Sequence, residues 1–181
     1  MTILNLEQIE SIILLVRTLP DDKLSAILDE LQNELPAVYR FIYGEPSDAI
    51  ASLNQDMANL YMDLSFDVIW VFQKAFGNPP NIEDNEKWVI NKLALLDAEL
   101  KSLISEIPMD TKFRKNLQER FIQRSFDTSI QIELLEYLRR EVIEYASFDA
   151  KREQAVDLTA NLLLILVRLF GDLYSFDAKH R

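Results

Sequence analysis

Apolar residues recur along this chain at alternating spacings of four and three residues, and this periodicity constrains the fold more than any other feature. The longest seam comprises Val89, Leu93, Leu96, Leu100, Leu103 and Ile107; shorter seams comprise Leu24, Leu28, Leu31, Leu35 and Leu158, Leu162, Ile165, Leu169. Seams of this kind pack one α-helix along another. No segment alternates strictly between apolar and polar residues, and 3 glycines are few for the turns of a sheet protein. The sequence therefore predicts an all-α antiparallel helical bundle without a sheet.

Prolines, glycines and capping residues divide the chain into about six or seven predicted helices. Asn5 with Gln8 matches a capping box, and the double proline Pro79-Pro80 is the strongest break. The predicted helices span residues 5–19, 21–35, 37–43, 47–76, 82–107, 110–145 and 149–174, with a bend near 125–129. We expect residues 1–45 to form an N-terminal helical hairpin packed on a main bundle of residues 46–181; the alternative is a single domain, 1–181.

Two of these helices resemble each other in sequence, over residues 63–77 and 157–171. Both contain Asp-Leu-hydroxyl, then Asp or Asn, five apolar residues, one base and finally Phe-Gly. At about 100° per residue, Asp63 and Asp67 share one narrow stripe, and Asp157 and Asn161 share the matching stripe. These four residues are the candidate ligands for a metal ion or another cation. The alternative is that each stripe is the solvated edge of an otherwise buried helix.

The remaining circumference of both helices is almost wholly apolar and needs to be covered. We expect a homodimer in which one or both helices meet a second copy, because two-fold dimers are the commonest oligomers. The predicted interface residues are Ile69, Phe72, Phe76, Leu163, Leu166 and Phe170. The alternative is that the two helices pair with each other at the centre of one monomeric bundle.

The net charge of −11 disfavours nucleic acid and anionic membranes as partners. The most basic stretch, residues 112–124, has its apolar residues at helical spacing and is predicted to be one solvated helix face. The longest aliphatic run, residues 162–167, is far shorter than the roughly 20 residues of a membrane span. Acidic residues rather than a basic segment occur near residue 1, which favours the cytoplasm.

The residue inventory offers little catalytic chemistry. The chain has no cysteine, and its single histidine is His180. Thiol catalysis, zinc fingers and the paired Glu-x-x-His motifs of di-iron bundles are therefore excluded. We predict no catalytic residues and no cofactor, and we favour a non-enzymatic interaction or regulatory protein that associates with itself.

Two other functions remain as alternatives. Glu-x-x-Glu pairs at positions 7/10, 133/136 and 141/144 allow a Mg²⁺-dependent enzyme that acts on a phosphorylated small molecule. That hypothesis requires carboxylates from different helices to converge on one pocket. The acidic composition also allows an inhibitor, such as an antitoxin, that neutralises a basic partner.

Overall fold

The computed structural model describes residues 1–80, 82, 84–104, 107–125, 130–147 and 150–179. It is 83% helical, and no strand occurs among the described residues, so the prediction of an all-α fold is confirmed. The helices are α1 (Leu6–Val16), α2 (Asp21–Glu34), α3 (Pro36–Tyr43), α4 (Glu45–Leu53), α5 (Gln55–Phe76), α6 (Asn85–Lys101), α7 (Thr111–Ser125), α8 (Ile132–Ala146) and α9 (Glu153–Lys179), with a short 3₁₀ turn, Ala150–Arg152, before α9.

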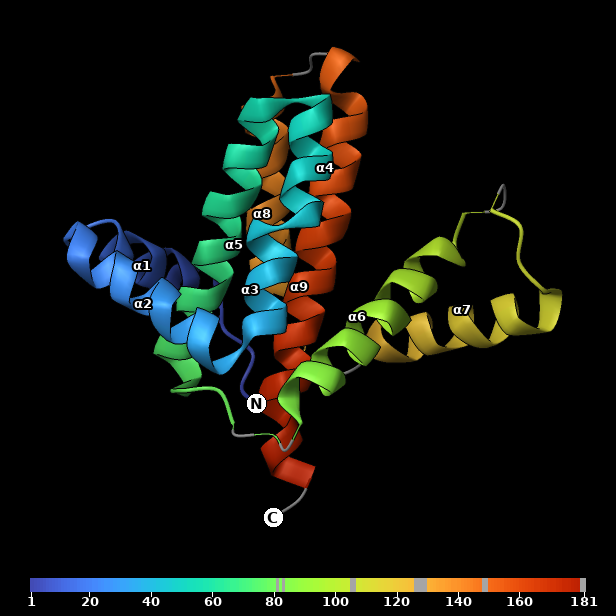
Figure 1. The fold of residues 1–181 in the computed structure, drawn as a ribbon, viewed down its shortest axis with the longest axis horizontal. Helices are drawn as coiled ribbons and strands as arrows, with labels where there is room; N and C mark the ends of the chain where they lie inside the picture. Colours follow the sequence, from blue (N-terminus) through green and yellow to red (C-terminus); the bar gives the residue numbers. More distant parts are fainter. Residues whose placement is uncertain (81, 83, 105–106, 126–129, 148–149, 180–181) are drawn as a thin grey trace.

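Two helical hairpins, α4–α5 and α8–α9, form the centre of the molecule (Figure 1). The second helices of these hairpins, α5 and α9, lie side by side and run in the same direction. Ring contacts fix this register: the centroid of Phe72 lies 5.3 Å from that of Phe170, and Phe76 lies 6.0 Å from Tyr174. The bundle is therefore not antiparallel throughout, because its two central helices are parallel.

Buried apolar side chains form one continuous cluster across these elements. The cluster includes Ile9 and Ile13 of α1, Leu31 of α2, Ile69 of α5 and Leu166 of α9. Burial of side chains of this size contributes about 1.5–3 kcal/mol each. The N-terminal hairpin thus shares a hydrophobic core with the main bundle, across the boundary predicted at residue 45.

Two of the predicted helices are each divided in two, so the structure has more helical segments than predicted. The predicted helix 47–76 is interrupted at Asn54, whose side chain accepts a hydrogen bond from the backbone N–H of Met57 at 3.0 Å and caps α5. The predicted helix 110–145 is divided between α7 and α8. The bend expected near 125–129 falls largely on residues 126–129, which lie outside the described residues.

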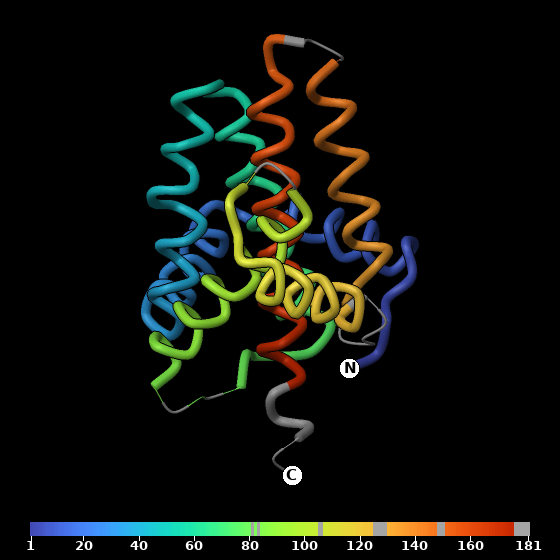
Figure 2. Tube along the Cα trace, turned by 90° about the vertical axis from the view of Figure 1, so that its right-hand side faces the viewer, coloured from blue at the N-terminus to red at the C-terminus, as the bar shows by residue number. Residues whose placement is uncertain are grey.

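Two appendages extend from opposite sides of the bundle (Figures 1 and 2). The helices α1 and α2 lie on one side, and α6 with α7 forms a protruding arm on the other. The first helix of the arm ends at Lys101 rather than at the predicted Ile107. Leu96, within α6, is buried as its seam predicts. Leu103 belongs to the same seam but lies beyond the end of the helix, and it is 48% exposed.

Among the described residues, no helix combines the length and apolarity that crossing a membrane requires.

Candidate functional site

A cavity of about 390 Å³ lies between α2 and α5, and we refer to it as the α2–α5 cavity. The turn after α1 and the end of α3 contribute to its walls. Its apolar lining comprises Val16, Leu19, Leu24, Leu28, Met62 and Phe66, and its polar lining comprises Arg17, Asp21, Tyr43 and Asp63. Binding cavities for small ligands generally measure about 300–1,000 Å³ and combine apolar walls with a few polar groups, as this one does.

The cavity exists because α2 is only partly covered. Its leucine seam divides into two halves: Leu31 and Leu35 are 2% and 3% exposed, whereas Leu24 and Leu28 are half-buried and line the cavity. Among the described residues, α2 packs chiefly against α3, and the cavity separates its first two turns from α5. Two leucines at seam positions therefore face a hollow instead of a neighbouring helix.

An ion pair between Arg17 and Asp67 forms one side of this region. Arg17 follows the last turn of α1, and its Nη2 donates to Oδ2 of Asp67 at 2.6 Å. The Arg17 side chain is 51% exposed, whereas that of Asp67 is fully buried. Burial raises the pKa of Asp67 from 3.8 to about 6, because loss of hydration outweighs the attraction of Arg17. The second carboxylate oxygen, Oδ1, accepts no hydrogen bond from the described residues.

The remaining polar groups give the cavity an acidic character. Asp21 and Asp63 are exposed and come from two different helices, while the charge of Arg17 is already balanced by Asp67. Tyr43 contributes a phenol whose pKa is raised, first by burial and then by its neighbours Tyr39 and Asp63. The phenol therefore stays protonated and can donate a hydrogen bond. Such a cavity is suited to an apolar group that carries a positive charge.

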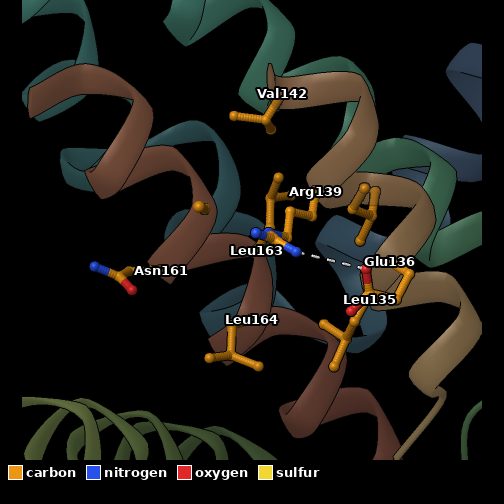
Figure 3. Close-up of a pocket in the computed structure, with 9 residues that line it drawn as sticks. Leu135, Glu136, Arg139, Val142, Asn161, Leu163 and Leu164 are labelled. Carbon is orange, nitrogen blue, oxygen red and sulfur yellow. Dashed lines mark ion pairs between the residues drawn. The ribbon is translucent and has the colours of Figure 1, made fainter. Parts of the chain in front are cut away.

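Two other hollows are less suitable as binding sites. Figure 3 shows a groove of about 220 Å³ between α8 and α9, where Arg139 extends towards Glu136. This ion pair has an N–O distance of 3.8 Å, and both side chains are about two-thirds exposed, so it offers little fixed polarity. A larger depression beside α1, of about 610 Å³, is lined by Leu4, Glu7, Gln8, Ser11, Ile12 and Ala75. None of these residues is a buried charged group.

A buried cluster of charges joins the arm to α9. Glu99 of α6 is completely buried, and its Oε1 accepts hydrogen bonds from Nε of Arg120 at 3.1 Å and from Nε of Arg124 at 3.2 Å. Its other oxygen lies 3.9 Å from Nη1 of Arg168 on α9. The guanidinium of Arg168 also stacks over Phe121 of α7, 4.2 Å from the ring centroid. These contacts attach both arm helices to the bundle.

Asp172 of α9 completes this cluster. Its Oδ2 accepts hydrogen bonds from Nη1 of Arg124 at 2.6 Å and from Nζ of Lys92 at 3.2 Å. The prediction that residues 112–124 form one solvated basic face is therefore wrong for Arg124, whose side chain is 15% exposed. Both carboxylates of the cluster, Glu99 and Asp172, are paired with basic side chains that come from α6, α7 and α9, so the cluster connects the arm to the bundle.

The structure places the four candidate metal ligands in different surroundings. Asp63 lines the α2–α5 cavity, whereas Asp67 is buried against Arg17. Asp157 and Asn161 are exposed on α9, and Asn161 lies beside the α8–α9 groove in Figure 3. Within the described part of the chain, no group of three or more His, Cys, Asp or Glu side chains is placed to hold a metal ion.

The six predicted interface residues lie on α5 and α9, where Phe72 contacts Phe170, whereas Leu163 lines the groove between α8 and α9. Phe76 is half-buried; the other five, Ile69, Phe72, Leu163, Leu166 and Phe170, are at most 2% exposed. Within one chain, α5 and α9 are in contact, as the alternative describes, and whether the chain forms a dimer remains a prediction. Five of the six side chains are thus buried within one chain, and a dimer built by this fold would use other surfaces.

Arg17, Asp21 and Tyr43 had no distinguishing signal in the sequence. Arg17 follows the end of α1 and Asp21 begins α2, positions where charged residues are common, and Tyr43 has the spacing of an ordinary core aromatic. Asp63 was identified through the stripe that it shares with Asp67. The stripe showed an unusual polar edge, but not which residues of other helices face it.

Comparison of the chain with protein-family models, with curated proteins and with solved structures finds no match.

Proposed function

We propose that this protein is a non-enzymatic interaction protein whose α2–α5 cavity binds an apolar segment of a protein partner that carries a lysine or arginine. The proposal rests on the leucine seam of α2, whose N-terminal half is only partly covered by the rest of the protein. Leu24 and Leu28 remain half-buried there, beside Asp21 and Asp63. We also propose that the protein is located in the cytoplasm and that it acts by associating with itself.

Apolar burial and charge attraction would both favour the binding of such a segment. Covering Leu24 and Leu28 further removes apolar surface from water, at about 25 cal/mol per Å². The carboxylates of Asp21 and Asp63 attract a cation, and Arg17 does not oppose this because Asp67 compensates its charge. An anionic ligand would meet two carboxylates and is disfavoured. A basic partner is also what the inhibitor hypothesis requires.

One observation favours the Mg²⁺-dependent enzyme as a second candidate. Asp21 of α2 and Asp63 of α5 are carboxylates from different helices that line one cavity. Mg²⁺ sites are commonly built from one or two carboxylates together with substrate phosphates. Titration of Mg²⁺ into the protein by calorimetry tests this candidate, and binding that Asp63→Asn abolishes would support it.

The proposed function is tested with decylammonium as the simplest cationic apolar probe and decanoate as its anionic counterpart. We expect calorimetry to show binding of decylammonium at least tenfold tighter than binding of decanoate. Asp63→Asn is expected to weaken decylammonium binding several-fold, and Leu28→Trp to block it by filling the cavity. Asp157→Asn is the matched control, because Asp157 has the corresponding place in the similar helix and is exposed. Equal binding of both probes, or binding insensitive to both cavity variants, contradicts the proposal.

A further inference from the structure

The free end of the α6–α7 arm exposes large apolar side chains. Leu103 is 48% exposed, Ile104 is 45% exposed and Phe113 is 53% exposed. We call these three residues the arm tip. Apolar residues exposed singly are common, whereas large apolar side chains that gather at one place can form an interaction surface.

Hydrogen bonds within the arm hold this end in place. The guanidinium of Arg114 donates to the carbonyls of Ser102 and Ile104, each at 2.8 Å, and to that of Ile107. Gln118 donates to the same Ser102 carbonyl at 3.0 Å. These bonds satisfy carbonyls at and beyond the end of α6, where the regular helical hydrogen bonds stop. The polar backbone is thus bound inside the arm, and the apolar side chains remain outside.

The two ends of the molecule carry opposite charge. Residues 101–124 contain six basic and three acidic residues, whereas residues 1–35 contain seven acidic and two basic residues. Lys112 and Lys115 are exposed beside the arm tip, and Asp21 and Asp63 are exposed at the α2–α5 cavity. In Figure 1 the arm and the α1–α2 pair lie at opposite ends of the longest axis of the molecule. One chain therefore cannot bring its own arm tip to its own cavity.

We infer that the partner of the α2–α5 cavity is the arm tip of a second copy of this chain. The inference rests on the proposed function, because it names the occupant of the same cavity. The arm tip supplies the apolar side chains, and Lys112 supplies the positive charge that Asp21 and Asp63 attract. Because the two surfaces differ, the contact is head-to-tail. Repetition of such a contact produces a ring if the rotation closes and an open chain of subunits if it does not.

Complementation between two variants tests the inference. Leu103→Ser combined with Ile104→Ser removes apolar surface from the arm tip but leaves the cavity intact. Asp63→Lys reverses an exposed charge at the cavity but leaves the arm tip intact. Each variant alone is expected to remain at 21.1 kDa by sedimentation velocity, from micromolar to millimolar concentration. An equimolar mixture is expected to form a heterodimer of twice that mass and nothing larger, because only one functional contact is available per pair.

Matched controls separate this contact from general effects of substitution. Ile122→Ser removes a 56% exposed apolar side chain from α7 of the same arm, away from the arm tip in sequence, and is expected to associate like the unmodified chain. Asp157→Lys reverses an exposed charge on α9 and is expected to behave in the same way. Circular dichroism of all four variants is expected to show unchanged helix content, because every substituted side chain is exposed.

The unmodified chain is expected to increase in mass with concentration, and high salt is expected to reverse this increase by screening the charges. A constant mass of 21.1 kDa at all concentrations overturns the inference. Association that survives in the arm-tip variant also overturns it.

If decylammonium binds the cavity while the chain remains monomeric, only the inference fails and the proposed function stands. If decylammonium does not bind either, both fail. Binding of the unmodified chain, but not of the arm-tip variant, to vesicles containing anionic lipid would assign the arm tip to a membrane instead.

Discussion

Asp67 is a fully buried carboxylate on the central helix α5, and its one hydrogen-bond partner among the described residues is the half-exposed guanidinium of Arg17. A buried charge of this kind destabilises the folded state unless its partners replace the lost hydration. Arg17 does so for one oxygen only, and the nearby carboxylates of Asp63 and Glu141 add repulsion. The pKa of Asp67 is therefore raised, and protonation relieves the cost of burial.

This raised pKa predicts that Asp67→Asn removes part of the pH dependence of stability. Because the native pKa of about 6 exceeds the ordinary 3.8, the native state binds the proton more tightly than the unfolded state. The stabilisation of the folded state that Asp67 provides by binding a proton is thus fully present below pH 3.8. It is lost as the pH rises through about 6. Relative to the unmodified chain, Asp67→Asn should become more stable across this interval, by up to about 3 kcal/mol. Urea denaturation as a function of pH measures this difference.

The control for this experiment is Asp157→Asn, which changes an exposed aspartate on the similar helix α9. Its stability curve should parallel that of the unmodified chain. A parallel curve for Asp67→Asn as well would show that Asp67 titrates normally in the folded protein.

Glu99 presents the opposite situation, a buried carboxylate surrounded by guanidinium groups. In Glu99→Gln, Arg120, Arg124 and Arg168 lose the anion that they share. Removal of one partner from a buried ion pair generally costs about 3–5 kcal/mol, because the remaining charge is left uncompensated. We expect Glu99→Gln to lower the free energy of unfolding by about that amount in urea. Glu119→Gln, at a 63% exposed position paired with Lys115, should change it by less than about 0.5 kcal/mol. Equal effects of the two substitutions would mean that the cluster does not hold the arm.

At the scale of elements, the sequence predicted which segments are helical better than it predicted where each helix ends. The seam from Val89 to Ile107 is continuous in sequence, yet α6 ends at Lys101 and leaves Leu103 exposed. An a/d seam identifies an apolar stripe but not the helix that covers it. The break at Asn54 was missed for a related reason, since the apolar periodicity on both sides concealed a good capping residue.

The same seam provides a matched pair of substitutions. Leu96 is 2% exposed and Leu103 is 48% exposed. Leu96→Asp places an unpaired charge in the core and should destabilise the fold by several kcal/mol, whereas Leu103→Asp should be nearly neutral. Thermal unfolding followed by circular dichroism measures both. A melting temperature of Leu96→Asp within a degree or two of the unmodified chain would show that α6 does not pack on the bundle.

At the scale of the whole molecule, composition and periodicity were sufficient for the fold class, but not for the pairing of distant residues. Arg17 meets Asp67 across 50 positions of sequence, and Arg124 meets Asp172 across 48. A single sequence shows which charged residues the chain contains, but it does not show which of them form ion pairs in the folded protein. For this reason Asp63 was identified as a candidate, whereas the cavity that it lines with Arg17 and Tyr43 required the three-dimensional arrangement.

The distribution of charge over the whole molecule also predicts that the protein does not bind duplex DNA at physiological salt. The net charge of −11 repels the phosphate backbone, and only a local row of free cations could overcome this repulsion. The best candidate row, residues 112–124, does not provide one. Arg114 is bound to backbone carbonyls, and Arg120 and Arg124 are bound to Glu99. We expect no shift of a duplex in a gel-shift assay at micromolar protein. Tight binding that weakens steeply with added salt would contradict this, and loss of that binding in Lys112→Ala combined with Lys115→Ala would locate it on the outer face of α7.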